Sequence, residues 1–438
     1  MSKGPRVVMP PGLSSLLVGL ALLLGPGCEK SEAARRSDFE RDLELGKVDE
    51  TGKRVRVAER MRPKKIPSRP PERWLESTGL PPVTLQGNWG SPLDLGVAFP
   101  APQSTLLEDG SFLLTGGRTG NPLGSKALLF NPASGALRPL AMEVPLPPGS
   151  HIALKLPDGS VFLIKTGAGI PSTARVIPWE NRVDSLPAPL PTRTAEECRG
   201  TLLPDGRVLL FMAGYDAEQK PCAQVYDPKD RQWRLTEPPP FFPARGVLTW
   251  LGEGRLLITG GWDAQKGGNL HQAMIFDPQT GHFKETGPMH STRRNHTATL
   301  LPTGHVLIAG GYDTNQELDT TELFDPVART FHPGPKLPFP LARHGARLLG
   351  SGNLLLSSGS ALLLLDGHTL QLQILKNPEA IVPDASGTDL EHAADVWREN
   401  AALALDSTGT PWLFGGTRLK VGQYGLEDMT SRTALSLH

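Results

Sequence analysis

The 438-residue chain has no excess of either charge, since 45 lysines and arginines balance 45 aspartates and glutamates. A protein that clamps nucleic acid over a large surface needs a basic excess, because it must displace counterions from the phosphates. That function is therefore disfavoured. The overall charge balance combines two segments of different composition. Residues 29–78 carry 14 basic and 11 acidic side chains, whereas residues 79–438 carry 29 basic and 34 acidic side chains.

The sequence also lacks the short motifs of common enzymes. It contains no H-E-x-x-H, no G-x-S-x-G, no Walker loop and no clustered Cys and His ligands. These absences count against zinc peptidases, serine hydrolases of that type and nucleotide hydrolases. We predict no catalytic residue, no metal site and no cofactor.

The apolar run near the N-terminus is too short to span a bilayer comfortably. It covers Leu13–Leu24, about a dozen residues, and follows the basic residues Lys3 and Arg6. This arrangement is typical of an export signal, which we place at residues 1–27. The chain is therefore predicted to work outside the cytoplasm.

The end of this signal, Leu24–Cys28, resembles a bacterial lipobox, in which a small residue precedes a lipidated cysteine. Gly25 departs from the pattern, because an aliphatic residue is usual there. The resemblance implies that Cys28 is lipidated and anchors the protein in the cell envelope, in the inner or the outer membrane; ordinary signal cleavage is the alternative. Residues 28–78, half charged and then rich in proline, are predicted to form an extended tether with a marginal helix over Glu32–Leu45.

Besides Cys28, the chain contains two cysteines, Cys198 and Cys222. Exported proteins meet an oxidising compartment in which cysteines commonly pair. We predict a disulfide between them; the alternative is two buried thiols.

Helical architectures are disfavoured because 48 glycines and 43 prolines interrupt the chain throughout. The glycines follow a pattern: steps of 47 to 57 residues separate the positions Gly117, Gly167, Gly214, Gly261, Gly311, Gly359 and Gly416. A period of this size indicates stacked supersecondary units. We assign residues 79–438 to this repeat domain.

The clearest unit runs from His296 to Phe331. Its Leu-Pro-Thr-Gly turn lies between two apolar runs and predicts a tight hairpin, and its double glycine ends the second strand. The Phe-Asp-Pro segment predicts a third strand that stops at a proline turn, and Phe331 marks a fourth strand. Four short strands in about 48 residues make one propeller blade.

These residues resemble the kelch family, in which a double glycine is followed by an aromatic-Asp-Pro strand and then a spaced Trp or Phe. The repeat glycines are Gly116, Gly117, Gly214, Gly260, Gly261, Gly310, Gly311, Gly359, Gly415 and Gly416. The resemblance implies an all-β, kelch-type β-propeller, with seven blades expected and six possible. Thr433–Leu437 would supply a strand of the last blade, and a strand around Val83–Trp89 would close the ring.

Arginines recur near the start of the first strand of several units, and histidines lie close to them. The candidate binding residues are Arg199, Arg245, Arg294, His296, Arg343 and His344, with His151 nearby. First strands line the channel of a propeller, so these arginines should gather at one mouth, where guanidinium groups suit a carboxylate, a phosphate or an acidic peptide. The alternative is a structural role between blades. The aspartates after the glycines, Asp216, Asp263 and Asp313, are expected to form Asx-turns.

The enzymatic propellers of this kind include the galactose-oxidase-like copper enzymes, whose site uses tyrosines and a Tyr-His pair. The four tyrosines here never precede a histidine, so copper-radical oxidation is disfavoured. We predict a non-catalytic, monomeric binding or scaffold module for a protein or glycan partner, with Trp250 and Trp262 as the candidate glycan contacts. The alternative is a periplasmic, carbohydrate-active propeller of the sugar isomerase or mutarotase kind.

Overall fold

The computed structural model describes residues 90–99, 102–118, 125–140, 151–165, 172–190, 198–215, 221–263, 267–358, 361–376, 401–422, 425–430 and 433–437. The chain divides into two units, 1–66 and 67–438, and every described residue belongs to the second. The predicted signal peptide, Cys28, the tether, its helix and Val83–Trp89 lie outside the described residues. No helix among the described residues is long and apolar enough to cross a membrane.

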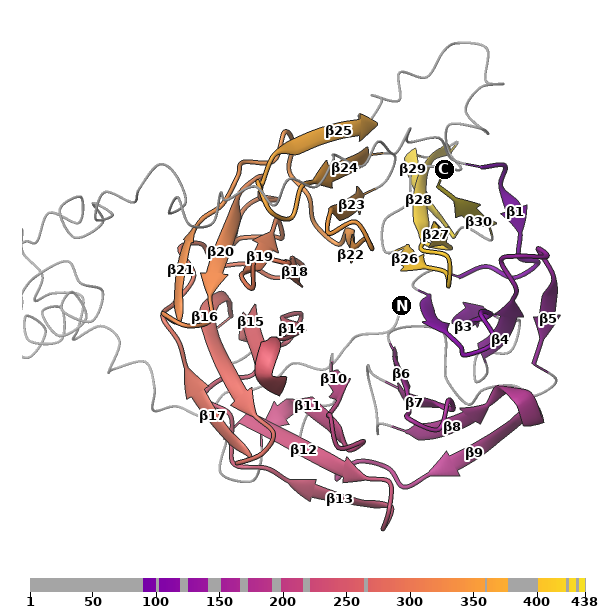
Figure 1. Cartoon of the computed structure of the whole chain (residues 1–438). Helices are drawn as coiled ribbons and strands as arrows, with labels where there is room; N and C mark the ends of the chain where they lie inside the picture. The colour runs from indigo at the N-terminus through magenta and orange to yellow at the C-terminus, as the bar shows by residue number, and fades with distance from the viewer. Residues whose placement is uncertain are drawn as a thin grey trace, which may run out of the picture. The chain divides into compact units, whose positions relative to one another are not determined.

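The described residues form seven four-stranded antiparallel sheets, which we call blades 1 to 7 and which follow one another around a ring (Figure 1). Blade 1 contains β2 (Gln103–Leu106), β3 (Phe112–Arg118), β4 (Ser125–Phe130) and β5 (Leu137–Pro139). Blade 2 contains β6 (His151–Lys155), β7 (Val161–Lys165), β8 (Thr173–Ile177) and β9 (Arg182–Leu186). Blade 3 contains β10 (Arg199–Leu202), β11 (Val208–Tyr215), β12 (Pro221–Asp227) and β13 (Gln232–Leu235).

The next three blades repeat this order. Blade 4 contains β14 (Val247–Trp250), β15 (Leu256–Asp263), β16 (Gly268–Asp277) and β17 (His282–Glu285). Blade 5 contains β18 (Thr297–Leu300), β19 (Val306–Ala309), β20 (Thr321–Asp325) and β21 (Thr330–Pro333). Blade 6 contains β22 (Gly345–Leu348), β23 (Leu354–Ser358), β24 (Ala361–Leu365) and β25 (Leu372–Lys376). The fold is therefore an all-β propeller with seven blades, as predicted, rather than six.

Blade 7 joins the two ends of the ring. Its strands are β26 (Ala402–Leu405), β27 (Pro411–Phe414), β30 (Thr433–Ser436) and, on the outside, β1 (Leu93–Asp94), which pairs with β30 (Figure 1). The last strand of the chain lies where it was predicted. An N-terminal strand does close the ring, and the segment that the structure shows in this place is β1.

Besides the blades, the described residues form a small two-stranded sheet and short 3-10 helices. The strands β28 (Thr417–Gly422) and β29 (Gly425–Thr430) form a separate two-stranded sheet inserted between β27 and β30. Short 3-10 helices follow β8 at Pro178–Glu180 and β14 at Gly252–Gly254.

The core consists of seven apolar clusters, and each cluster fills the space between two neighbouring blades. The second strand of blade 4 shows how the sequence achieves this. Leu256 and Ile258 pack toward blade 3, whereas Leu257 between them packs toward blade 5. Successive side chains of a strand point to opposite faces, so a strand between two blades must be apolar throughout. The continuous apolar runs before the double glycines follow from this geometry.

The double glycines allow the backbone of one blade to approach the next. Gly310 and Gly311 both have positive φ, 59° and 100°, which a residue with a Cβ rarely adopts. A Cβ on Gly310 would lie 2.1 Å from the carbonyl oxygen of Leu341, which precedes the next blade. The repeat glycines are thus required by both backbone conformation and space.

Candidate functional site

A cavity of about 640 Å³ lies at the rim between blades 3 and 4, away from the channel. Two pairs of its lining side chains already contact each other, namely Arg234 with Asp230 and His282 with Glu237. Candidate residues predicted from the sequence lie instead at the channel.

The first strands of all seven blades surround a central cavity of about 630 Å³. Its lining includes three of the predicted residues, Arg199, His296 and His344. It also includes Arg347, which the sequence analysis did not select. No aspartate or glutamate is among the described residues that line this cavity.

The two arginines of the cavity occupy different depths. Arg199 begins β10, four residues before the turn residue Leu203, whereas Arg347 lies only two residues before the equivalent Leu349. Residues two apart on a strand share a face, so both side chains project to the same side of their strands, about 7 Å apart along the channel. Arg199 donates from Nε to the carbonyl oxygen of Gly246 in the next blade, at 3.1 Å.

Two of the predicted arginines sit in a backbone belt around the mouth. Arg245, Asn295 and Arg343 precede the first strands of blades 4, 5 and 6, and all three have positive φ, between 51° and 57°. The amide of Asn295 donates to the carbonyl oxygen of Arg245, and the amide of Arg343 donates to that of Asn295, both at 3.0 Å. This belt explains why the position recurs, and it holds the two arginines in fixed places.

Arg294 lies one residue before the belt and takes a different role. Its guanidinium carbon lies 4.9 Å from the ring centroid of Trp262, and that of Arg343 lies 5.5 Å from the ring of Tyr312. In both cases an arginine of one blade covers the aromatic residue that follows the double glycine of the preceding blade. Such cation–π contacts are worth about 0.5–1 kcal/mol at exposed sites. Trp262, a predicted glycan contact, is thus covered on one face by Arg294.

The histidines near the mouth tie neighbouring blades together. His296 and His344 are buried, and their Nε2 atoms lie 2.8 Å from the hydroxyls of Thr259 and Thr297 in the preceding blades. His151 makes the same contact with Thr115, at 2.6 Å. Burial lowers the pKa of His344 to about 4, and burial together with the nearby charge of Arg293 holds the pKa of His296 well below its usual range. Both imidazoles are therefore neutral at pH 7.

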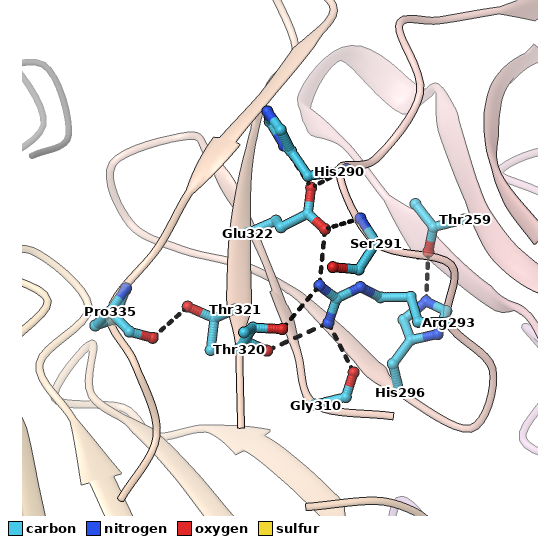
Figure 2. Close-up of polar contacts among 10 residues, drawn as sticks. All are labelled: Thr259, His290, Ser291, Arg293, His296, Gly310, Thr320, Thr321, Glu322 and Pro335. Atoms are coloured by element: carbon cyan, nitrogen blue, oxygen red, sulfur yellow. Dashed lines mark hydrogen bonds and ion pairs between the residues drawn. The ribbon is translucent and has the colours of Figure 1, made fainter. Parts of the chain in front are cut away.

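A buried charged cluster lies behind this mouth, and the sequence analysis did not find it (Figure 2). Arg293 is fully buried and donates from Nη2 to Oε1 of Glu322, which is 2% exposed, at 2.7 Å. Its Nη1 donates to the carbonyl oxygens of Gly310 and Thr320. The one available signal was Glu322 itself, an acidic residue that begins the apolar segment Glu322-Leu-Phe of a buried strand.

The carboxylate of Glu322 also holds the loop that leads into blade 5. It accepts hydrogen bonds from the backbone amides of His290, at 2.8 Å, and Ser291, at 3.1 Å (Figure 2). Burial by itself would raise the pKa of Glu322, but the hydrogen bonds from His290 and the charge of Arg293 keep it below its usual value. The hydrogen bond to Glu322 in turn raises the pKa of His290. This cluster is an anchor for the chain rather than an accessible site.

The structure corrects the predicted disulfide. Cys198 and Cys222 are both buried thiols, and no disulfide joins them. Cys198 directly precedes β10, and Cys222 lies on β12, so the intervening strand β11 separates them. Two strand spacings are about 9.5 Å, beyond the roughly 7 Å that a disulfide can span between Cα atoms.

One of the predicted turn aspartates, Asp313, forms the expected Asx-turn. Oδ1 of Asp313 accepts hydrogen bonds from the amides of Asn315 and Gln316, at 2.7 and 2.9 Å, as expected for an Asx-turn. Asp216 and Gly359 lie outside the described residues. Trp250, the other predicted glycan contact, is half-buried and donates from Nε1 to the hydroxyl of Thr201 in blade 3.

Comparisons with known proteins agree with this architecture. The kelch motif matches residues 293–338, which include all four strands of blade 5. The solved structure of a novel fungal alcohol oxidase of the AA5 family, in complex with copper, is similar with a TM-score of 0.59 and 13% identity, over 80% of this chain and 76% of that chain. That similarity shows the fold, and no curated protein sequence matches. The resemblance to kelch propellers is thereby confirmed.

The described residues show no arrangement that resembles a copper site. Within the described ranges, no three His, Cys, Asp or Glu side chains come together as a metal ion requires. The described tyrosine side chains have other contacts: Tyr226 packs on Trp233, and the hydroxyl of Tyr312 donates to Glu317. We derive no chemistry from a copper ion here.

Proposed function

We propose that this kelch-motif propeller is a non-catalytic recognition module that binds an acidic segment of a protein partner at the mouth of its channel. A propeller of this kind is consistent with a binding or scaffolding role. We further propose that the module is exported, anchored to the cell envelope through Cys28 and held off the membrane by residues 28–78. The ring would then present its mouth to a partner in the periplasm or outside the cell.

The observation that carries this proposal is the arrangement of arginines on successive blades. Blades 3, 4, 5 and 6 each place one at or just before the start of their first strand, namely Arg199, Arg245, Arg294 and Arg343. The backbone belt and the aromatic rings of Trp262 and Tyr312 fix three of them in space. Fixed guanidinium groups lose little conformational entropy on binding and suit the bidentate geometry of carboxylates.

Reversing the charge at the mouth should abolish partner binding. We expect the Arg245→Glu, Arg343→Glu variant to lose, in affinity capture from native membranes, the protein that the wild type retains. The reason is that two attractive ion pairs become repulsive. Capture by the wild type should also weaken steeply as salt is raised, because exposed charge pairs are screened.

The matched control is Lys229→Glu, Lys284→Glu, which makes the same charge change at exposed positions on the outer part of blades 3 and 4. This control should retain the partner. The thermal midpoint of the Arg245→Glu, Arg343→Glu variant should stay within a few degrees of the wild type. A large loss of stability would mean that the arginines serve the structure, and an unchanged captured protein would refute the proposal.

The lipid anchor is tested separately. Metabolic labelling with palmitate should mark the wild-type protein and leave Cys28→Ser unlabelled, since the thiol accepts the lipid. The variant should also move from the membrane to the soluble fraction, because it lacks the acyl chains that would hold the proposed anchor in the bilayer. Labelling that persists in Cys28→Ser would remove the anchor from the proposal without affecting the recognition site.

A further inference from the structure

Arg347 is a cation of the channel whose side chain is exposed and makes one hydrogen bond among the described residues. It lies on β22, lines the central cavity of about 630 Å³ and remains accessible to solvent within it. In the described part of the chain its guanidinium donates to a single acceptor, the carbonyl oxygen of Ala346, at 2.8 Å. A guanidinium carries five N–H groups, so most of its donors face the cavity.

The surroundings of Arg347 favour an anion. The described lining contains a second guanidinium, Arg199, and no aspartate or glutamate. Blades 3 and 6 are three steps apart in a ring of seven, so the two arginines lie on opposite sides of the channel. Desolvation by the surrounding blades lowers the pKa of Arg347 from its ordinary value, while solvent still reaches the exposed side chain.

We propose that the central channel is a second binding site, in which Arg347 holds a small oxyanion, either a carboxylate or a phosphate compound. This site differs from the proposed mouth in its position, since Arg347 lies two residues deeper than Arg199 and four residues beyond Arg343, and in its ligand, which must fit inside the ring. A bound oxyanion would satisfy the guanidinium with paired hydrogen bonds and would balance its charge in an enclosed place, where both effects are strongest.

The rest of the lining supplies neutral donors for such a ligand. Thr299 lies two residues before its turn on the adjacent blade 5, the same depth as Arg347 on blade 6, and it lines the cavity. Gln103 and Ser104 of blade 1 line it as well. The cavity volume is that of about twenty water molecules, so a small organic acid or a phosphorylated metabolite fits. A cation would meet only positive charge and neutral groups.

The test is calorimetric titration of the full chain with inorganic phosphate and, separately, with citrate, at constant ionic strength in sodium chloride. We expect saturable binding of at least one anion to one site. Arg347→Gln should weaken that binding by roughly tenfold or more, and Arg347→Lys should retain part of it because the charge is kept. The two titrations distinguish phosphate from carboxylate ligands.

Two controls make the result specific. Arg207→Gln removes an arginine that pairs with Asp205 outside the channel and should leave anion binding unchanged. Without added anion, Arg347→Gln should melt close to the wild type, since the side chain is exposed and makes a single hydrogen bond, to the carbonyl oxygen of the preceding residue. Arg245→Glu, Arg343→Glu should still bind the anion, so this site and the mouth can fail independently. No saturable binding of either anion below about 10 mM, or equal binding by Arg347→Gln, would overturn the proposal.

Discussion

Replacing Glu322 with glutamine should lower the free energy of unfolding by about 3–5 kcal/mol. The substitution preserves shape but leaves the guanidinium of Arg293, which is fully buried, without its counter-charge. A buried cation cannot recover its hydration, and the carbonyl oxygens of Gly310 and Thr320 only partly replace a carboxylate. The amides of His290 and Ser291 also lose a charged acceptor.

The measurement is urea denaturation followed by tryptophan fluorescence, with Asp319→Asn as the matched control. Asp319 pairs with Lys336 at 3.0 Å, but the lysine side chain is 73% exposed, and such surface pairs contribute at most about 1 kcal/mol. The control should therefore differ little from the wild type. A loss below 1 kcal/mol for Glu322→Gln would show that water reaches the cluster.

A double-mutant cycle separates the ion pair from its surroundings. Arg293→Met, Glu322→Met should be more stable than the sum of the two single losses predicts, because no uncompensated charge is then buried. It should still be less stable than the wild type, since the carbonyl oxygens of Gly310 and Thr320 lose their donor. Additive losses would mean that the two side chains act independently.

The number of blades could be predicted from the sequence because one structural requirement recurs in each unit. Gly310 must adopt a positive φ and must also leave room for the backbone of the following blade, and only glycine meets both demands. The apolar runs before the glycines follow from burial on two faces. Such local requirements are visible in a single sequence at the repeats that keep both glycines, and the spacing extends the count to the others.

The position of the closing strand could not be derived in the same way. β1 consists of Leu93 and Asp94, and it forms two residue pairs with β30. A strand this short has no measurable periodicity, so the pattern around Val83–Trp89 gave an equally plausible prediction. The last blade lacked a fourth strand, so an N-terminal strand could be predicted to supply it. The structure shows such a strand, which closes the ring.

The candidate site was predictable only as a region. Arginine recurs near several first strands, but a shift of one residue decides its role: Arg293 enters the core, Arg294 covers Trp262, and Arg343 belongs to the belt. The left-handed residue before the first strands of blades 4, 5 and 6 redirects the chain, and the sequence does not show which residue adopts it. Arg347 was missed because nothing distinguishes a residue facing the channel from any other polar residue on a strand.

Lowering the pH from 7 to 4 should destabilise the propeller through its buried histidines. The pKa of His344 is about 4 in the folded chain, compared with about 6.5 when unfolded. A group whose pKa is lowered by folding adds stability above its unfolded pKa, and this stability is lost as the pH falls toward the folded value. For His344 alone the loss is about 3 kcal/mol, and His296 shifts in the same direction.

His290 and Glu322, in the buried cluster around Arg293, also have shifted pKa values, and their contributions to stability change over different pH ranges. Folding raises the pKa of His290, so its contribution is complete below its unfolded value and is lost as the pH rises through the folded one. Folding lowers the pKa of Glu322, and that contribution is lost only when the pH approaches the range in which carboxylates protonate. As the pH falls from 6.5 to 5, His344 and His296 therefore contribute less to folding stability, whereas His290 contributes more. Because two histidines lose stability and one gains it, the net change is destabilising.

The variant that isolates this effect is His344→Gln, which keeps a hydrogen-bonding group near the hydroxyl of Thr297 but cannot take up a proton. Urea midpoints measured at pH 7, 6, 5 and 4 should fall less steeply for this variant than for the wild type, although its stability at pH 7 is lower. His282→Gln, at an exposed position on blade 4, should fall as the wild type does. If the wild type held its midpoint down to pH 4.5, or if His344→Gln showed the wild-type slope, protonation of His344 would not be coupled to unfolding. The Thr–His contacts would then join neighbouring blades in a region where water can solvate a charged imidazole.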